Sequence, residues 1–193
     1  PQCASVCSPQ EEEVLERTYA EIEQELFNRM EGAPIDQHIV LFLDGWESLI
    51  DNNMEVEEKT RHLVREGLSY NIHVVISASR WNNLRANIRD SLTTRWELRL
   101  GDTGDSIAGR KNAEQVPALP GRGMTAGGLH FLFALQDEDG LRAIAQQWSQ
   151  EEPVKPLLLL PRSVSTTQLG PVTASSKHGY RIPLGIEGNT CLL

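Results

Sequence analysis

Two short apolar runs, separated by a segment with helical periodicity, most constrain the fold of this chain. The first run is residues 38–43 (HIVLFL), and the second is residues 72–77. Continuous apolar runs of this length are typical of strands in a parallel sheet, because helices cover both faces of such a sheet. Residues 55–69 between them carry apolar side chains near one helical face. The order strand, helix, strand predicts a right-handed crossover and a doubly wound α/β sheet.

A long amphipathic helix is predicted before the first strand, over residues 9–31. Its apolar positions recur at spacings of three and four residues: Leu15, Tyr19, Ile22, Leu26 and Met30. Ser8 can cap this helix, and the acidic residues of the first turn suit the positive end of the helix dipole. We expect most of the other Glu side chains to form a solvated face.

Shorter elements are predicted after the second strand. We expect a short helix near residues 84–88, a strand at 95–100, a helix at 105–116, a loop at 117–128, a strand at 129–135 and a helix at 137–150. The composition then changes to that of a linker. We therefore divide the chain into a first domain (residues 1–150), a linker (151–178) and the start of a second domain (179–193).

The composition favours a globular chain that neither crosses a membrane nor binds nucleic acid broadly. It has 193 residues, with 18 Lys and Arg against 27 Asp and Glu, which gives a formal charge of −9. This acidic balance makes nucleic acid the minority interpretation. No apolar run approaches the roughly 18 residues of a membrane span, and the first residues lack the pattern of a signal peptide, as expected for a cut inside a longer chain. The three cysteines lack zinc-ligand spacing, which favours free thiols and the cytoplasm.

The residue that follows the first strand is the strongest candidate for chemistry. Asp44 is expected at the carboxyl edge of the sheet, where a carboxylate can hold Mg²⁺ through water beside nucleotide phosphates. The alternative is that Asp44 only caps a helix or forms a turn. Residues 77–81 (SASRW) follow the second strand, and a serine there can sense a γ-phosphate or cap the next helix. Arg122, in the segment 120–123 (PGRG), can face an anion or solvent, and we expect a tight hairpin turn there.

Two features of an ATP-hydrolysing site are absent from the sequence. The phosphate-binding motif GxxxxGK[ST] does not occur in the 193 residues. Gly45 follows Asp44 at the position where a hydrolytic P-loop ATPase carries a Glu that orients the attacking water. The nearest Glu is Glu47, two residues after Gly45. The five His residues are dispersed, and we expect them to be core or surface residues rather than ligands.

Four segments in this order resemble the FtsK/SpoIIIE-type ATPases of type VII (ESX) secretion systems, the EccC components: IVLFLDGWESL, LSYNIHVVISASRW, LRANIRDSLTTRWELRLGDTGDS and PGRGMTAGGLHFLFALQ. The resemblance covers residues 1–150 as the latter part of one ATPase module, and YRIPLGIEG resembles the opening of the next. It implies a RecA-like P-loop NTPase fold with a mostly parallel sheet flanked by helices. The fold is expected to be incomplete here, with the Walker A loop upstream of Pro1.

The resemblance also implies roles for individual residues. Asp44 matches the Walker B aspartate, which would bind Mg²⁺ through water, and Ser79 and Arg80 match a sensor-like strand end that would contact ATP. Arg29 matches the arginine of the family's long helix, which would act as a finger toward the nucleotide of a neighbouring module. The alternative for Arg29 is an ion pair with Glu25 at i−4.

The leading hypothesis is a degenerate nucleotide-binding module of a type VII secretion motor, because Gly45 replaces the water-orienting Glu. It would support export of WXG-type substrates by nucleotide binding, docking or regulation. Trp46 and Trp81 would then line an apolar pocket for a substrate tail or a linker, and the alternative is that both belong to the core. The competing hypotheses are a catalytically active FtsK-like module, for protein export or DNA translocation, and a purely structural α/β fragment.

The resemblance also implies which partners such a module has and where in the cell it lies. Its partners would be the other ATPase modules of the same chain, WXG-type substrates and the membrane components of the secretion system. The parent protein would be an oligomer at the cytoplasmic face of the bacterial inner membrane, anchored by segments outside this chain.

Overall fold

The computed structural model describes residues 2–134, 137–161, 163–165, 167, 169, 171, 173–175 and 179–181. The chain divides into two compact units, one made of residues 1–18 and 151–193 and the other of residues 19–150. All the candidate site residues belong to the second unit. The domain boundaries at residues 150 and 178 remain predictions, and the expected start of another module lies outside the described residues beyond Arg181.

Helix α1 (Glu12–Met30) forms where the amphipathic pattern predicts it. The carboxylate of Glu11 accepts hydrogen bonds from the backbone N–H and the hydroxyl of Ser8, at 2.7 and 2.9 Å, and so closes the turn before the helix. The buried stripe consists of Leu15, Tyr19, Ile22, Leu26 and Arg29. Arg29 takes the last buried position because it lies three residues after Leu26, whereas Met30 is 47% exposed.

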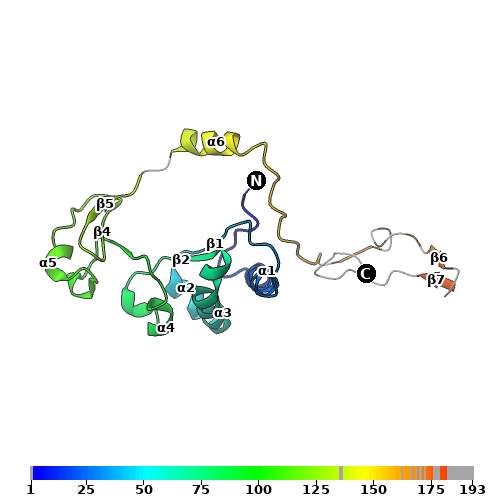
Figure 1. Ribbon diagram of the computed structural model, residues 1–193, viewed down its shortest axis with the longest axis horizontal. Coiled ribbons are helices and arrows are strands. Elements are labelled where there is room, and N and C mark those ends of the chain that lie inside the picture. Colours follow the sequence, from blue (N-terminus) through cyan, green and yellow to red (C-terminus); the bar gives the residue numbers. More distant parts are fainter. Residues whose placement is uncertain are drawn as a thin grey trace. The chain divides into compact units, whose positions relative to one another are not determined.

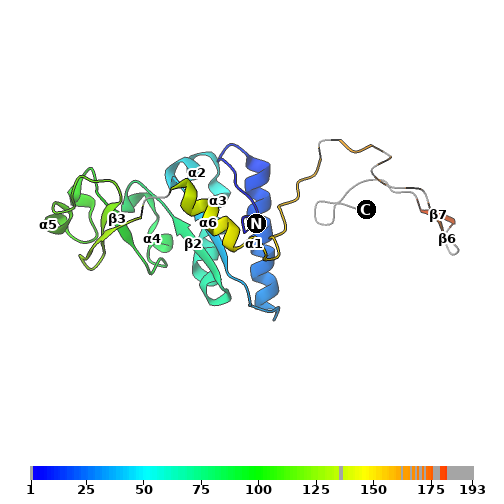
Figure 2. The ribbon, with the colours of Figure 1, turned by 90° about the horizontal axis from the view of Figure 1, so that it is seen from above.

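Strands β1 (Ile39–Leu43) and β2 (Ile72–Ile76) pair in parallel. Between them run α2 (Trp46–Asn52), α3 (Met54–Glu66) and the 3-10 helix η1 (Gly67–Tyr70). Helix α3 contacts α2, η1 and β2, and both ribbon views show this group together (Figures 1 and 2). The predicted strand–helix–strand unit is confirmed. The sequence did not indicate α2, which begins two residues after Asp44.

One face of the β1–β2 pair is buried and the other carries exposed apolar side chains. Leu41 and Leu43 are buried, while Val40, Phe42 and Val75 are 46%, 72% and 39% exposed. Side chains alternate between the two faces of a strand, so the exposed residues form one apolar surface. The prediction of strands buried on both faces is therefore wrong for β1 and β2 in this chain.

A buried polar contact joins α1 to α3 within the core. The hydroxyl groups of Tyr19 and Thr60, both fully buried, lie 2.7 Å apart and share a hydrogen bond. Trp46 and Leu63 are also fully buried, and Ile72 is 1% exposed. The core of this unit therefore lies between α1, α3 and one face of the parallel pair.

A separate antiparallel sheet follows, in the order β3 (Trp96–Leu98), β4 (Arg122–Thr125) and β5 (His130–Leu132). The predicted strands at 95–100 and 129–135 are present in shorter form and pair with β4 rather than continuing the parallel sheet. The loop predicted at 117–128 is partly wrong, because it contains β4. The segment 120–123 does hold a tight turn, because the N–H of Arg122 donates to the carbonyl of Leu119 at 3.3 Å and Gly121 has φ 74°. The hairpin turn between β4 and β5 comes after β4, where Gly128 has φ 81°.

Short helices and a terminal hairpin complete the described elements: η2 (Trp81–Asn83), α4 (Ala86–Arg89), η3 (Thr103–Asp105), α5 (Arg110–Ala113), α6 (Glu138–Gln147), β6 (Thr173–Ser175) and β7 (Gly179–Arg181). The helix predicted at 105–116 is shortened to α5 because Gly109, with φ 87°, precedes it. Helix α6 confirms the predicted closing helix. Throughout the described part of the chain, every helix is too short or too polar to cross a bilayer.

Candidate functional site

Asp44 is exposed at the carboxyl edge of the β1–β2 pair, one residue after β1. The hydroxyl of Ser77, the first residue after β2, donates a hydrogen bond to Asp44 Oδ1 at 2.5 Å and accepts one from the backbone N–H of Gly45 at 2.8 Å. The backbone closes the same edge, because the N–H of Trp46 donates to the carbonyl of Ser77 at 2.9 Å. Both strand ends therefore hold the carboxylate of Asp44 in place.

Gly45 adopts a backbone conformation that disfavours other residues. Its φ and ψ are 74° and 59°, in the left-handed region, and it immediately precedes α2. A side chain in this conformation costs about 1–2 kcal/mol. A Cβ at this position would meet nothing within 4 Å, so the constraint comes from the backbone and not from space. The turn that presents Asp44 therefore disfavours a Glu at the next position.

Glu47, in the first turn of α2, joins this helix to the segment after β2. Its Oε1 accepts hydrogen bonds from the backbone N–H of Ser79 at 2.8 Å, the hydroxyl of Ser79 at 2.8 Å and Nδ2 of Asn83 at 2.6 Å. Burial raises the pKa of Glu47, but hydrogen bonds from Asn83, from its own backbone N–H and from Ser79 outweigh burial and lower the pKa from 4.5 to about 2. Glu47 is therefore ionised at neutral pH and is engaged by its neighbours.

Glu97, in β3, is a second buried acceptor and is 3% exposed. It accepts hydrogen bonds from Nε1 of Trp81 at 3.2 Å, from the hydroxyl of Ser106 at 2.6 Å and from the backbone N–H of Ile107 at 2.9 Å. The guanidinium of Arg95 lies 5.9 Å from the centre of the Trp81 ring. Trp81 is thus fixed to the antiparallel sheet.

Arg80 lies between two residues whose positions are fixed, Ser79 and Trp81. Its own side chain is 63% exposed, and its Nε lies 3.7 Å from a carboxylate oxygen of Asp105. The structure therefore places Ser79 and Arg80 after β2 at the edge where Asp44 follows β1. Their contact with a nucleotide stays a prediction.

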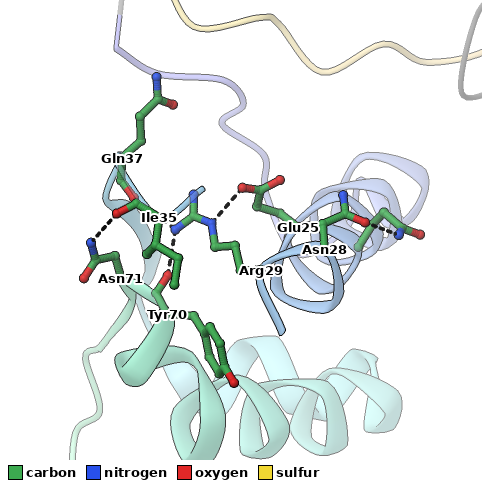
Figure 3. Close-up of polar contacts among 8 residues, drawn as sticks. Glu25, Asn28, Arg29, Ile35, Gln37, Tyr70 and Asn71 are labelled. Carbon is green, nitrogen blue, oxygen red and sulfur yellow. Dashed lines mark hydrogen bonds and ion pairs between the residues drawn. The ribbon is translucent and has the colours of Figure 1, made fainter. Parts of the chain in front are cut away.

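Arg29 is buried, and its guanidinium makes three hydrogen bonds (Figure 3). Nε donates to Glu25 at 2.7 Å, and Nη1 donates to the carbonyls of Gln37 at 3.0 Å and Tyr70 at 2.7 Å. The ion pair with Glu25 expected as the alternative is confirmed. Gln37 and Tyr70 precede β1 and β2, so Arg29 lies at the amino edge of the strands, roughly 16 Å along them from Asp44. A finger role would require these bonds to break.

Trp46 lies in the core and is 0% exposed, which confirms the core alternative for this residue. Its indole N–H has no hydrogen-bond partner among the described residues. Trp81 is half-buried beside Glu97. A ligand could reach Trp46 only if the core around this residue opened. The predicted apolar pocket therefore stays a prediction.

The oxygen atoms at this edge of the sheet suit a magnesium ion that is bound through water. Mg²⁺ retains several waters and takes one or two carboxylates together with substrate phosphates. Asp44 offers an exposed carboxylate, and the hydroxyl of Ser77 orients it. Over the residues that the structure describes, no three His, Cys, Asp or Glu side chains gather as a metal site. Asp44 is the residue that would hold such an ion, and magnesium binding at this edge stays a prediction.

Comparison with known sequences decides the family. The FtsK/SpoIIIE family profile matches residues 1–139. The chain belongs to the FtsK/SpoIIIE family. It is 39% identical over 151 residues to the ESX-4 secretion system protein EccC4 of Mycobacterium tuberculosis and 38% identical over 164 residues to the ESX secretion system protein EccC of Thermomonospora curvata. Each alignment covers 77% of this chain and 12% of the relative, so the chain spans a small part of these proteins.

Solved structures confirm the predicted fold class. The chain resembles the T. curvata EccC ATPases 2 and 3 in complex with a signal sequence peptide, with a TM-score of 0.70 and 31% identity over 97% of this chain and 40% of that chain. It also resembles the cytoplasmic domain of the T. curvata type VII secretion ATPase EccC, with a TM-score of 0.71 and 32% identity over 97% of this chain and 26% of that chain. The fold is that of an FtsK-like P-loop NTPase, and the EccC resemblance is confirmed.

The sequence predicted roles for Ser79 and Arg80 but not for the residues that hold this segment. Glu47 binds Ser79 and Asn83, and Glu97 binds Trp81. The contact between Ser77 and Asp44 could have been predicted from the register of the two strands. Leu43 pairs with Ile76, so the next residues along the two parallel strands are Asp44 and Ser77. Glu47 and Glu97 have no comparable signal, because their partners lie in segments outside the strands, where no register fixes which residues meet.

Proposed function

We propose that this chain is part of a degenerate nucleotide-binding module of a type VII secretion motor ATPase. The observation that carries the proposal is the contrast between two carboxylates at one edge of the fold. Asp44 is exposed and oriented by Ser77, whereas Oε1 of Glu47 already accepts hydrogen bonds from Ser79 and Asn83. Among the described residues, this edge thus offers an exposed carboxylate for a metal at Asp44, whereas the carboxylate of Glu47 is engaged through one of its oxygens.

Nucleotide binding is supported by the chemistry of the strand ends. Asp44 would hold Mg²⁺ through water, with Ser77 fixing the rotamer of the carboxylate. Arg80 would supply a guanidinium for phosphate oxygens, which suits phosphate because of its planar set of donors. The hydroxyl of Ser79 donates to Glu47, so Ser79 would contact a phosphate oxygen only by exchanging that bond. The phosphate-cradling loop would come from outside these 193 residues. When bound, Mg²⁺-ATP would supply the charge that these side chains recognise.

Loss of hydrolysis is supported by the backbone as well as by the sequence. Gly45 stands where a hydrolytic ATPase of this kind carries a Glu, and its left-handed conformation disfavours that side chain. Glu47 is close in sequence, but its pKa of about 2 makes it a poor base at neutral pH. Both features favour a module that holds nucleotide without turning it over.

The partners follow from the relatives. The similar proteins are named as ESX secretion system components, and one similar structure holds a signal sequence peptide. We extend to this chain the export of WXG-type substrates, docking against other ATPase modules and membrane components of the system, an oligomeric parent and a place at the cytoplasmic face of the bacterial inner membrane. The module would contribute by nucleotide binding, docking or regulation.

ATP turnover by the natural-length protein tests the degenerate part of the proposal. Asp44→Ala is compared with Asp51→Ala, a matched change at an exposed aspartate in α2. We expect both variants to keep the wild-type turnover rate, because this module does not contribute to hydrolysis. A fall in turnover with Asp44→Ala alone would show an active module and overturn the proposal.

A further inference from the structure

We infer that Glu47 and Glu97 are positioning residues that hold the turn at residues 79–83, and that this turn presents the exposed guanidinium of Arg80 to an anionic phosphate ligand. The inference rests on the proposed function, because the ligand is the phosphate chain of the nucleotide that Asp44 would anchor. It gives a role to Glu97, which neither the sequence motifs nor the family resemblance singled out, and a new role to Glu47.

Glu47 fixes both ends of the 79–83 turn. Oε1 of Glu47 accepts hydrogen bonds from the backbone N–H and the hydroxyl of Ser79. The same oxygen accepts a hydrogen bond from the side-chain amide of Asn83 at 2.6 Å. Asn83 Nδ2 also lies 3.2 Å from the hydroxyl of Ser79, which closes the turn on itself. Glu47 belongs to α2, the helix that starts directly after Asp44 and Gly45, so the turn is tied to the helix that follows the metal anchor.

Glu97 fixes the middle of the turn from a different element. It lies in β3 of the antiparallel sheet and accepts from the indole N–H of Trp81. Burying a carboxylate is costly unless hydrogen bonds compensate. Ser106 and Ile107 supply two further donors to Glu97, at 2.6 and 2.9 Å. The carboxylate is therefore compensated while it holds Trp81.

Arg80 is the residue of this turn left available for a ligand. Its backbone neighbours on both sides are held by the two carboxylates, yet its side chain is 63% exposed, and the 3.7 Å approach to Asp105 is a loose contact. Exposed ion pairs of this kind contribute little to stability. A guanidinium on a fixed backbone and with a weak partner is free to turn toward phosphate oxygens and bind two of them at once.

The test measures Mg²⁺-ATP affinity of the natural-length protein by calorimetry. The variants are Glu47→Ala, Glu47→Gln, Arg80→Ala and the double variant of Glu47→Ala with Arg80→Ala, and the matched control is Glu55→Ala, an exposed Glu in α3. We expect about tenfold weaker binding for Glu47→Ala and for Arg80→Ala, which corresponds to about 1.4 kcal/mol. Glu47→Gln should be weakened less, because its amide oxygen still accepts, and the control should bind as the wild type does.

The double variant separates positioning from general destabilisation. If Glu47 acts through Arg80, adding Glu47→Ala to Arg80→Ala weakens binding no further. Additive losses, or wild-type affinity in Glu47→Ala, would overturn the inference while leaving the proposed function standing.

Hydrogen exchange, followed by mass spectrometry, gives a readout that needs no nucleotide. Residues 77–85 should exchange faster in Glu47→Ala and in Glu97→Ala than in the wild type, because the N–H of Ser79 and the indole of Trp81 lose their acceptors. If the wild type binds no Mg²⁺-ATP, the proposed function and the phosphate ligand both fail, and faster exchange would show only that the carboxylates hold the turn. Unchanged exchange would overturn the positioning itself.

Discussion

Ser77 donates a hydrogen bond from its hydroxyl to the carboxylate of Asp44 at 2.5 Å, one position beyond the last paired residues of β1 and β2. The two parallel strands thus each supply one half of the contact. Because both strand ends are set by the same sheet register, the carboxylate keeps its direction without help from a flexible loop. This relationship is the physical basis for treating Asp44 as a metal anchor rather than as a helix cap.

Lowering the pH should reduce the free energy of unfolding, because Glu47 becomes protonated. The pKa of this group is lowered from 4.5 to about 2 in the folded state, so its stabilising contribution is complete above about pH 4.5 and is lost as the pH falls toward 2. After discounting for its partial exposure, we expect Glu47→Gln to lower the free energy of unfolding by about 1 kcal/mol at pH 6 and by much less at pH 2. Urea unfolding at several pH values measures this. A constant difference across that range would contradict the account.

Loss of Arg29 should destabilise the chain strongly. Arg29→Ala leaves the carbonyls of Gln37 and Tyr70 without their buried donor, and we expect a loss of about 3 kcal/mol. Arg110→Ala is the control, because that side chain is 75% exposed and forms an i,i+4 pair with Glu114, so its removal should change stability by less than about 0.5 kcal/mol. If Arg29→Ala unfolds like the wild type but lowers ATP turnover in the natural-length protein, the finger interpretation is correct instead.

Much of the fold was readable because it depends on local pattern. The apolar runs and the spacing in α1 predicted both parallel strands and the long helix. The antiparallel sheet was harder to read, because Glu97 in β3 is buried while its neighbours Trp96 and Leu98 are 57% and 50% exposed, the reverse of the usual alternation. Strand β4 was hidden by Gly123, where an added Cβ would lie 2.3 Å from Cζ of Phe131, so only a glycine fits there.

The candidate site was readable only in part. The motif placed Asp44, Ser79 and Arg80 at strand ends, because a strand end can be recognised from the sequence. The partners could not be read, because Glu47 and Asn83 meet only once the chain has folded. Arg29 shows the opposite case. Helical spacing places Arg29 in the buried stripe of α1, and a buried charge requires hydrogen-bond acceptors. The sequence does not reveal that these acceptors are the carbonyls of Gln37 and Tyr70.

The exposed face of the parallel pair should cause self-association of the 193-residue chain. Phe42 is 72% exposed, with Val40 and Val75 on the same face, and exposed apolar patches favour association. We expect Phe42→Ser to lower the apparent mass of the chain in light scattering at a given concentration. Phe27→Ser, at a 57% exposed position in α1, is the matched control and should change it less. A wild-type chain that remains monomeric and melts cooperatively would contradict the prediction.

Trp46 should act as a core residue. Its ring is fully buried, so Trp46→Ala should lower the free energy of unfolding by about 3–5 kcal/mol. Trp46→Phe should cost less, because the indole N–H has no hydrogen-bond partner among the described residues to lose. Unfolding measurements test both changes. If Trp46→Phe keeps wild-type stability but loses affinity for a substrate-tail peptide, the pocket interpretation is favoured instead.

Calorimetric titration of Mg²⁺-ATP into the natural-length protein, wild type against Asp44→Ala, tests the central claim most directly. Asp51→Ala serves as the control for a carboxylate lost nearby. We expect Asp44→Ala to remove one submicromolar nucleotide site per chain while the protein stays folded, and Asp51→Ala to keep the site. An unchanged number of sites and unchanged affinities in folded Asp44→Ala would contradict the claim that this strand edge holds nucleotide.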